Sequence, residues 1–382
     1  MRYFRRTESY FELMDEQIEL ANRLLYQDIA FHLTLFDQDH VSEMHQYAEQ
    51  FGISSFKVYM NMEGEQGRGI LMDLRPGATA EDPHDVDYST AHLNEVFKAM
   101  AQAAAPLLLS IHCEDGKMLQ HGITKAQAMG MTGLEAWHIA CSDLAEAIAI
   151  TQAALFSRAH GVPVYFPHIG SLAAIQALRD ARACGTDFVA ETCPHFLAQT
   201  IDSPAGVLAK IKPPIRTQED QDAVWQALEE GLIETIGSDH VPFTLAEKNP
   251  GDIWSTRTAF GGTGLILPLL LSEGLARNRI SLQKLAQITS CNAAKAFGLY
   301  PRKGTLMPGA DADFVIIDQD RRWQIRGKEL LTASDFCVYE GMEVKGAVES
   351  VYVRGVKVFD KGKLVGKPGH GQYLRRNITM QH

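Results

Sequence analysis

The chain has 382 residues, of which 46% are hydrophobic and 22% charged, a composition typical of a globular protein with material for a large core. Its formal net charge of -11 argues against nucleic acid and anionic membranes as main partners, because both attract basic surfaces. The six cysteines are widely spaced and form no CxxC pair, which suits a reducing compartment such as the cytoplasm. The N-terminus lacks the apolar core of a signal peptide, and the longest nearly pure apolar run, LILPLLL, is far shorter than the roughly 20 residues that cross a bilayer. We therefore expect a cytoplasmic protein that binds neither nucleic acid nor membranes.

Six apolar runs rich in β-formers alternate with helix-like stretches along the first three quarters of the chain. The runs are IAFHLTLF (29–36), SSFKVYM (54–60), PLLLSIHCE (106–114), PVYFPHIG (163–170), DFVAETCP (187–194) and ETIGSDHVP (234–242). The stretches between them, such as SLAAIQALRDARACG and QEDQDAVWQALEEG, have apolar residues at i, i+3 and i+4 and end in glycine. This alternation predicts an α/β protein with a parallel sheet and helical crossovers, either a (β/α)8 barrel or a doubly wound sheet.

The pattern changes after about residue 300. KGTLMPGADADFVIID and AVESVYVRGVKVFDKGKLVG read as short alternating strands joined by turns rich in glycine and aspartate. We predict two units, a barrel over residues 1–300 and a small β domain over residues 301–382.

Ionisable side chains lie near the C-terminal ends of the predicted parallel strands, where α/β proteins carry their chemistry. They include Lys57, His112, His168 and Asp239. Imidazole and carboxylate are ligands that a divalent metal such as zinc takes in a catalytic site. Lys57 interrupts an apolar strand, so either its head reaches solvent or burial keeps the amine neutral, and a neutral amine can add carbon dioxide to become a carboxylate.

Several motifs, in order, resemble the cyclic amidohydrolases, specifically the hydantoinase and dihydropyrimidinase branch. They are SSFKVYM, IHCEDG, PHIGSLAAIQALRDAR, ETCPHFL, IGSDHVPF, NAAKAFGLYPRKGTLMPGADADFVIID and VGKPGHGQYLRR. The resemblance implies a (β/α)8 TIM-type barrel beside a small β-sandwich, assembled as a homotetramer or dimer. It also implies up to two Zn2+ ions, with Lys57 as a carboxylated bridging ligand, His112 and His168 as ligands of one metal, and Asp239 as a ligand of the other and the catalytic proton shuttle.

The chain departs from the pattern of this branch in three places. It contains no His-x-His pair, and IAFHLTLF resembles the third barrel strand, so we expect a barrel that lacks its first strands, from a fragment of a longer gene product or a degraded relative. At the substrate-binding positions, Met62 stands where the family has a tyrosine, and Lys212 stands where it has a serine before Pro-Pro. Lys212 either meets an anionic substrate or is structural.

The resemblance predicts metal-dependent hydrolysis of a small cyclic amide, opening a hydantoin or dihydropyrimidine ring. Two alternatives stay open: a non-catalytic or truncated member that acts as an assembly protein, and a ring hydrolase of the allantoinase or dihydroorotase kind. The retained Lys57, His112, His168 and Asp239 favour an enzyme, whereas the missing His-x-His favours an assembly protein.

Overall fold

A computed structural model of the chain describes residues 9–62 and 89–376. Its strands are β1 (Leu33–Thr34), β2 (Ser55–Tyr59), β3 (Leu108–His112), β4 (Val164–Phe166), β5 (Phe188–Thr192), β6 (Thr235–Ile236), β7 (Phe314–Gln324), β8 (Glu343–Val353), β9 (Val356–Asp360) and β10 (Lys363–Leu364). The α-helices are α1 (Phe11–Leu24), α2 (Gln38–Phe51), α3 (Thr90–Ala101), α4 (Gly116–Ala128), α5 (Gly133–Ala140), α6 (Asp143–His160), α7 (Leu172–Ala183), α8 (Pro194–Ala198), α9 (Gln218–Glu230), α10 (Leu245–Lys248), α11 (Ile266–Leu269), α12 (Leu282–Ala286) and α13 (Asn292–Ala296). The π-helical turns η5 (Leu270–Leu275) and η6 (Gln287–Cys291) continue α11 and α12.

The six predicted parallel strands form one sheet in the order β1-β2-β3-β4-β5-β6, each parallel to the next. This sequential order distinguishes the two folds that periodicity left open, because a doubly wound sheet reverses its strand order at a switch point and a barrel does not. Each strand is shorter than its apolar run. β1 has only two residues, and Ile29, earlier in the same run, bridges Tyr373 in the C-terminal segment. Within the described ranges the sheet has six strands, as expected for a TIM-type barrel without its first strands.

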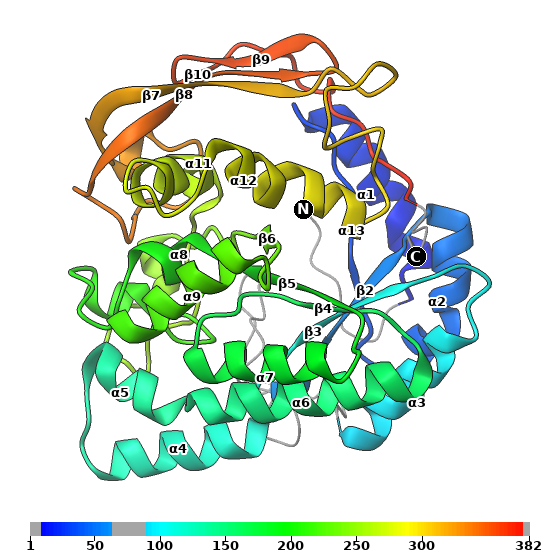
Figure 1. Cartoon of the computed structure of the whole chain (residues 1–382), viewed down its shortest axis with the longest axis vertical. Helices are drawn as coiled ribbons and strands as arrows, with labels where there is room; N and C mark the ends of the chain where they lie inside the picture. The colour runs from blue at the N-terminus through cyan, green and yellow to red at the C-terminus, as the bar shows by residue number, and fades with distance from the viewer. Residues whose placement is uncertain (1–8, 63–88, 377–382) are drawn as a thin grey trace.

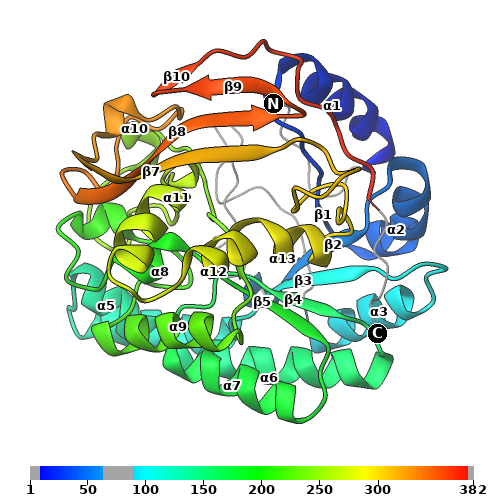
Figure 2. The ribbon, with the colours of Figure 1, turned by 45° about the horizontal axis from the view of Figure 1, so that its top comes forward.

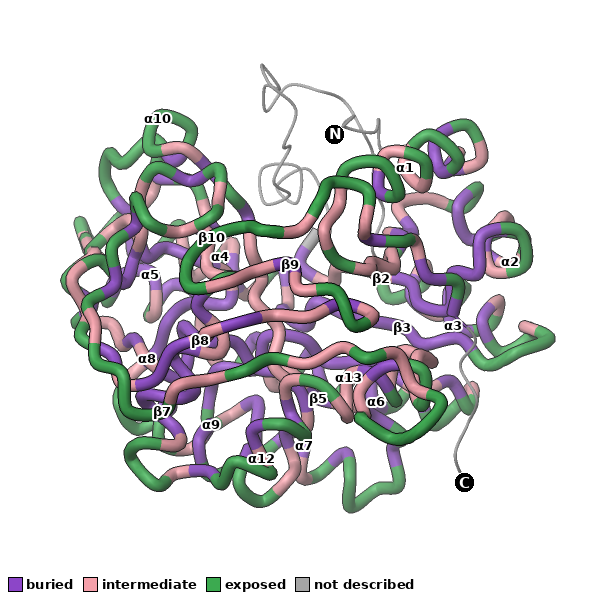
Figure 3. The backbone as a smooth tube through the Cα atoms, turned by 90° about the horizontal axis from the view of Figure 1, so that it is seen from above, coloured by how far each residue is buried: buried purple, intermediate pink, exposed green. Residues whose placement is uncertain are grey.

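Helices cover the outer face of this sheet, with α3, α6 and α7 side by side below the strands in Figure 1. Local sequence signals define their ends. The α9 helix starts at a capping box in which Thr217 and Asp220 satisfy each other's backbone N–H groups, and it stops at Gly231, whose φ of 82° belongs to the left-handed region. Buried positions gather on the central strands and on the inward helix faces (Figure 3). The sheet and its helices therefore share one continuous core.

One helical stretch, Gly133–His160, is long and apolar enough to cross a membrane by length and composition alone, with a mean hydropathy of 1.4. The structure divides it into α5 and α6 and packs α6 against α7 and α3. Core helices of globular proteins commonly meet the same criteria, and the packing of this pair against neighbouring helices is of that kind.

The predicted small β domain is a four-stranded antiparallel sheet in the order β10-β9-β8-β7. Figure 2 shows it stacked above α11, α12 and α13 at the edge of the barrel. The close contact between this sheet and Leu271 of η5 requires a glycine at position 346. The φ of Gly346 is +106°, and an added Cβ would lie 2.5 Å from the Cβ of Leu271. The sheet is consistent with the expected β-sandwich, and the boundary at residue 300 stays a prediction.

A partly buried ion network holds the N-terminal region against the small sheet. Lys303 Nζ donates to Asp28 at 2.5 Å and to Asp313 at 2.6 Å, and it pairs with Asp311 at 2.9 Å. Arg354 donates a second charged hydrogen bond to Asp28. Arg302 Nε also donates to Asp311 at 2.9 Å. Three carboxylates therefore pair with three cations, which makes this acidic cluster an ion-pair network with its charge already compensated rather than a metal centre.

Candidate metal and catalytic site

The four predicted metal ligands lie toward one edge of the parallel sheet. Lys57 lies in β2, His112 is the last residue of β3, His168 follows β4 and Asp239 follows β6. The register pairs Tyr59 with His112, so the ends of β2 and β3 are level. Because all six strands are parallel, their C-terminal ends meet at this edge, as the sequence predicted.

The two histidines face each other directly. His112 Nδ1 lies 3.0 Å from His168 Nε2, and the rings form an edge contact with centroids 4.6 Å apart. Two nitrogens bound to one tetrahedral zinc at about 2.05 Å would lie about 3.3 Å apart, so a small outward shift fits a metal between them. The donor set and its spacing therefore fit a divalent metal that would replace the proton shared by these two nitrogens.

Glu114 holds the far side of the His112 ring, and the Asn61 amide, which donates to Glu114 Oε2 at 3.4 Å, lies beside the same ring nitrogen. His112 Nε2 lies 2.6 Å from Glu114 Oε2 and 2.8 Å from Asn61 Nδ2, and all three side chains are buried. A carboxylate that accepts the Nε2–H of a histidine leaves its Nδ1 lone pair free and directed at the metal position. Glu114 lies in the IHCEDG motif, two residues after His112, but sequence reasoning assigned no role to it or to Asn61, which lies four residues after Lys57.

Burial keeps both imidazoles neutral. It lowers the pKa of His112 well below 6.5, with Lys57 and Lys212 adding to the effect, and it lowers the pKa of His168 in the same way, with His112 and Lys57 adding to it. Burial also raises the pKa of Glu114 to about 7, against the opposing charges of Lys212 and Arg216. Neutral imidazole is the form that ligates a metal, so the site is prepared for one.

Lys57 meets the condition for carboxylation that the sequence suggested. Burial lowers its pKa to about 8, while the nearby charge of Asp239 acts in the opposite direction. Among the described residues its Nζ has no hydrogen bond or ion pair, and it lies 5.0 Å from the centroid of the Tyr59 ring. A pKa of about 8 leaves roughly one amine in ten neutral at pH 7, about 300 times the share of an ordinary lysine.

Asp239 combines burial with an unusual backbone. Burial raises its pKa to about 6, opposed by the charge of Lys57. Its φ is 45° and that of His168 is 47°, both in the left-handed region that ordinary side chains rarely adopt. Such conformations gather where a fold must aim a functional side chain.

The two predicted substrate-binding residues are placed differently. Met62 closes the 3-10 turn η1 (Met60–Met62) directly after β2, and its side chain lies outside the described residues. Lys212 lies in the loop between η3 (Gly206–Ala209) and α9, and its Nζ is 5.2 Å from the Trp137 ring centroid. Its charge acts on His112 and Glu114, so this lysine belongs to the surroundings of the histidine pair.

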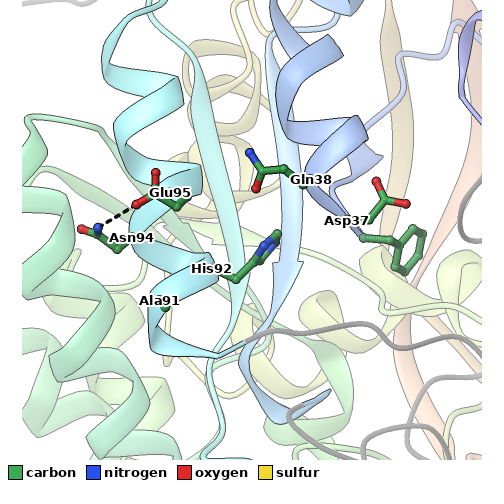
Figure 4. A pocket seen from close by; sticks show the side chains of 7 residues that line it. Asp37, Gln38, Ala91, His92, Asn94 and Glu95 are labelled. Carbon is green, nitrogen blue, oxygen red and sulfur yellow. Dashed lines mark hydrogen bonds between the residues drawn. The ribbon is translucent and has the colours of Figure 1, made fainter.

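A separate cavity of about 390 Å³ lies between α2 and α3, with Phe36, Asp37 and Gln38 on one side and Ala91, His92, Asn94 and Glu95 on the other. Figure 4 shows Gln38 and His92 projecting into the space between the two helices. None of the four predicted metal ligands lines it.

The amidohydrolase family matches residues 78–365 of the chain. The D-hydantoinase of Geobacillus stearothermophilus is 31% identical over 359 residues, which cover 91% of this chain and 72% of that enzyme. The L-hydantoinase of Paenarthrobacter aurescens is 30% identical over 292 residues, which cover 75% of this chain and 63% of that enzyme. The chain thus spans 63% of the length of the L-hydantoinase and 72% of the length of the D-hydantoinase.

Solved structures agree with these relatives. A dihydropyrimidinase from Brevibacillus agri NCHU1002 has a TM-score of 0.87 and 27% identity, with 99% of this chain and 80% of that chain covered. A D-hydantoinase from a Bacillus species has a TM-score of 0.83 and 29% identity with the same coverage. The histidine pair at the edge of a sequentially ordered parallel sheet, the family match and these neighbours agree: the chain belongs to the amidohydrolase family, in its hydantoinase and dihydropyrimidinase branch.

Proposed function

We propose that the chain is a metal-dependent hydrolase that opens a small cyclic amide ring of the hydantoin or dihydropyrimidine type. The observation that carries the proposal is the pair of buried neutral imidazoles, with His112 Nδ1 and His168 Nε2 3.0 Å apart at the C-terminal edge of the sheet. A protein that served only as an assembly partner would have no use for two buried imidazoles that meet in this way, beside a lysine of lowered pKa.

Four residues would hold the metal or orient its ligands. His112 and His168 would hold one metal, Glu114 would keep His112 in the ligating tautomer, and Lys57 in its carboxylated form would supply a bridging carboxylate. When bound, the metal would acidify water toward neutral pH and polarise the ring carbonyl.

Asp239 would move the proton. Its pKa of about 6 leaves it mostly ionised at pH 7, so it can accept a proton from the attacking water. The same carboxyl group would then deliver that proton to the leaving ring nitrogen as the C–N bond breaks. A base whose pKa lies close to the working pH performs both transfers well.

The finer features rest on the family resemblance and on this geometry together. We propose Zn2+ as the metal, because imidazole and carboxylate oxygen are its common ligands in hydrolases. We further propose a cytoplasmic location, consistent with cysteines that are all unpaired, and a homo-oligomer, either a dimer or a tetramer.

Metal analysis and a ring-opening assay test the proposal together. We expect about one tightly bound zinc per chain, because the histidine pair and Lys57 make up one half of a two-metal site and the sequence has no His-x-His for the other. His168→Ala should lose that zinc. His160→Ala, a matched control whose ring contacts Asn94 between the outer helices, should keep it.

Turnover is followed as loss of ring absorbance of hydantoin or dihydrouracil, with and without chelator. We expect slow, chelator-sensitive turnover, since each 1.4 kcal/mol of barrier left unrelieved by the incomplete metal site costs about tenfold in rate. Asp239→Ala should remove it while retaining the zinc of the histidine pair. Equal zinc in the wild type and His168→Ala would refute the site, and equal rates in the wild type and Asp239→Ala would refute the chemistry and favour a non-catalytic role.

A further inference from the structure

Two lysines, Lys210 and Lys212, lie over the face of Trp137. Two further basic side chains lie nearby: Lys248, the last residue of α10, donates to the carbonyl of Lys210, and Arg216 follows Lys212 by four residues. Lys210 Nζ donates to the carbonyl of Thr256 at 2.6 Å, and Lys248 Nζ donates to the carbonyls of Ala259 and Lys210 at 2.7 and 2.9 Å. These two ammonium groups have a structural role, because each replaces its lost water with backbone oxygens.

Arg216 is also engaged. Its guanidinium donates to the carbonyl of Cys141 at 2.8 Å and lies 3.5 Å from Glu146 Oε2, with both charged side chains almost fully buried. Lys212 differs from all three. Within residues 9–62 and 89–376 it has no hydrogen bond and no ion pair, and its recorded contact is the face of Trp137 at 5.2 Å.

The backbone on either side of Lys212 is fixed. The Trp137 Nε1–H donates to the carbonyl of Ile211 at 2.7 Å, and the carbonyl of Arg216 accepts from the N–H of Ile201 at 2.9 Å. The free ammonium is therefore carried by a loop anchored at both ends, and half-burial over an aromatic ring limits where its head can move. The Trp137 ring under this ammonium lies in α5, which packs against α4, the helix that begins two residues after Glu114. The charge of Lys212 accordingly acts on Glu114 and His112.

We propose that Lys212 binds a carboxylate carried by the ring substrate, so that the site takes anionic cyclic amides in preference to uncharged ones. An anchored, unpaired and half-buried ammonium beside a hydrolytic site gains most from a ligand that brings its own negative charge. The inference rests on the proposed function and names the class of substrate within it. A purely structural Lys212, serving as counter-charge to Glu114, would influence charged and uncharged rings equally.

Two ligands of nearly the same shape separate these roles. Hydantoin-5-acetate carries a carboxylate where 5-ethylhydantoin carries a methyl group, and equilibrium dialysis against the zinc-loaded full chain gives the affinity of each. We expect the acetate to bind about 10- to 100-fold more tightly, the range of a charge-assisted hydrogen bond. Lys212→Met should abolish this preference and Lys212→Arg should keep most of it. Lys295→Met, which removes an exposed lysine lying over Tyr300 at 5.3 Å, should leave it unchanged.

The outcomes separate this inference from the function on which it rests. Binding of both rings with equal affinity, or a preference that survives Lys212→Met, would overturn the carboxylate subsite and leave the proposed hydrolase standing. Failure of both rings to bind the zinc-loaded chain would overturn the proposed function and the subsite with it. A preference for the acetate that is lost in Lys212→Met and kept in Lys295→Met would support both the carboxylate subsite and the proposed hydrolase.

Discussion

Replacing Lys57 with methionine should remove a pH dependence that the buried amine imposes on folding. Burial lowers the pKa of Lys57 to about 8 in the folded chain, whereas a lysine in an unfolded chain titrates near 10.5. Between these values the unfolded chain binds the proton more often than the folded one, so the free energy of unfolding rises with pH. From pH 8 to pH 10 the rise amounts to at most about 2 kcal/mol, because partial exposure of the side chain lets solvent screen part of the shift.

Urea unfolding of the metal-free protein in carbonate-free buffer measures this effect. The free energy of unfolding of the wild type should rise relative to Lys57→Met between pH 8 and pH 10, and Lys295→Met should follow the wild type. Adding zinc and bicarbonate should then increase the native mass of the wild type, but not of Lys57→Met, by one carbon dioxide. Parallel pH profiles for the wild type and Lys57→Met would show that the fold leaves this amine with its ordinary affinity for protons, which would refute the reasoning for carboxylation.

Three other perturbations test the rest of the structure. Lys303→Met should lower the free energy of unfolding by about 1 to 3 kcal/mol in urea titrations, because it removes the cation that three partly buried carboxylates share while Arg354 and Arg302 keep Asp28 and Asp311 paired; an unchanged free energy of unfolding would contradict the ion network. Burial alone would raise the pKa of Asp28, but hydrogen bonds from its basic partners lower it below its unfolded value. The stability that this ionised carboxylate contributes is present above about pH 4 and should be lost as the pH falls further. In Asp28→Asn, the free energy of unfolding should therefore fall less steeply with acidification than in the wild type. Gly346→Ala should destabilise by about 1 to 3 kcal/mol more than Gly309→Ala in thermal or urea unfolding, since both glycines have positive φ but only Gly346 would drive a Cβ into Leu271; equal losses would mean that the small sheet shifts to accommodate it.

Much of the fold follows from short-range patterns in the sequence. Six apolar runs alternating with amphipathic stretches predicted the six parallel strands, and the glycine that ends QEDQDAVWQALEEG, Gly231, is where α9 stops. The capping box at Thr217, which starts α9, is an equally local signal. The pattern also brought His112 and His168 to one edge, because parallel strands place their C-terminal ends together. The choice between a barrel and a doubly wound sheet did not follow, since it depends on strand order, which periodicity does not encode.

The working details of the site depend on contacts between residues far apart in the chain. Asn61 lies 51 residues from His112 yet meets its Nε2, and Lys303 lies 275 residues from the Asp28 with which it pairs. The sequence placed Lys212 among the substrate residues but left open whether it serves the structure or the substrate. Only the packed loops show that Lys210, Lys248 and Arg216 are engaged while Lys212 is not. Local sequence determines where a strand or helix begins and ends because those signals act within a few residues. Which polar groups satisfy one another, and which remain available to a ligand, is decided when distant segments are buried together and each must replace the hydrogen bonds that it made to water.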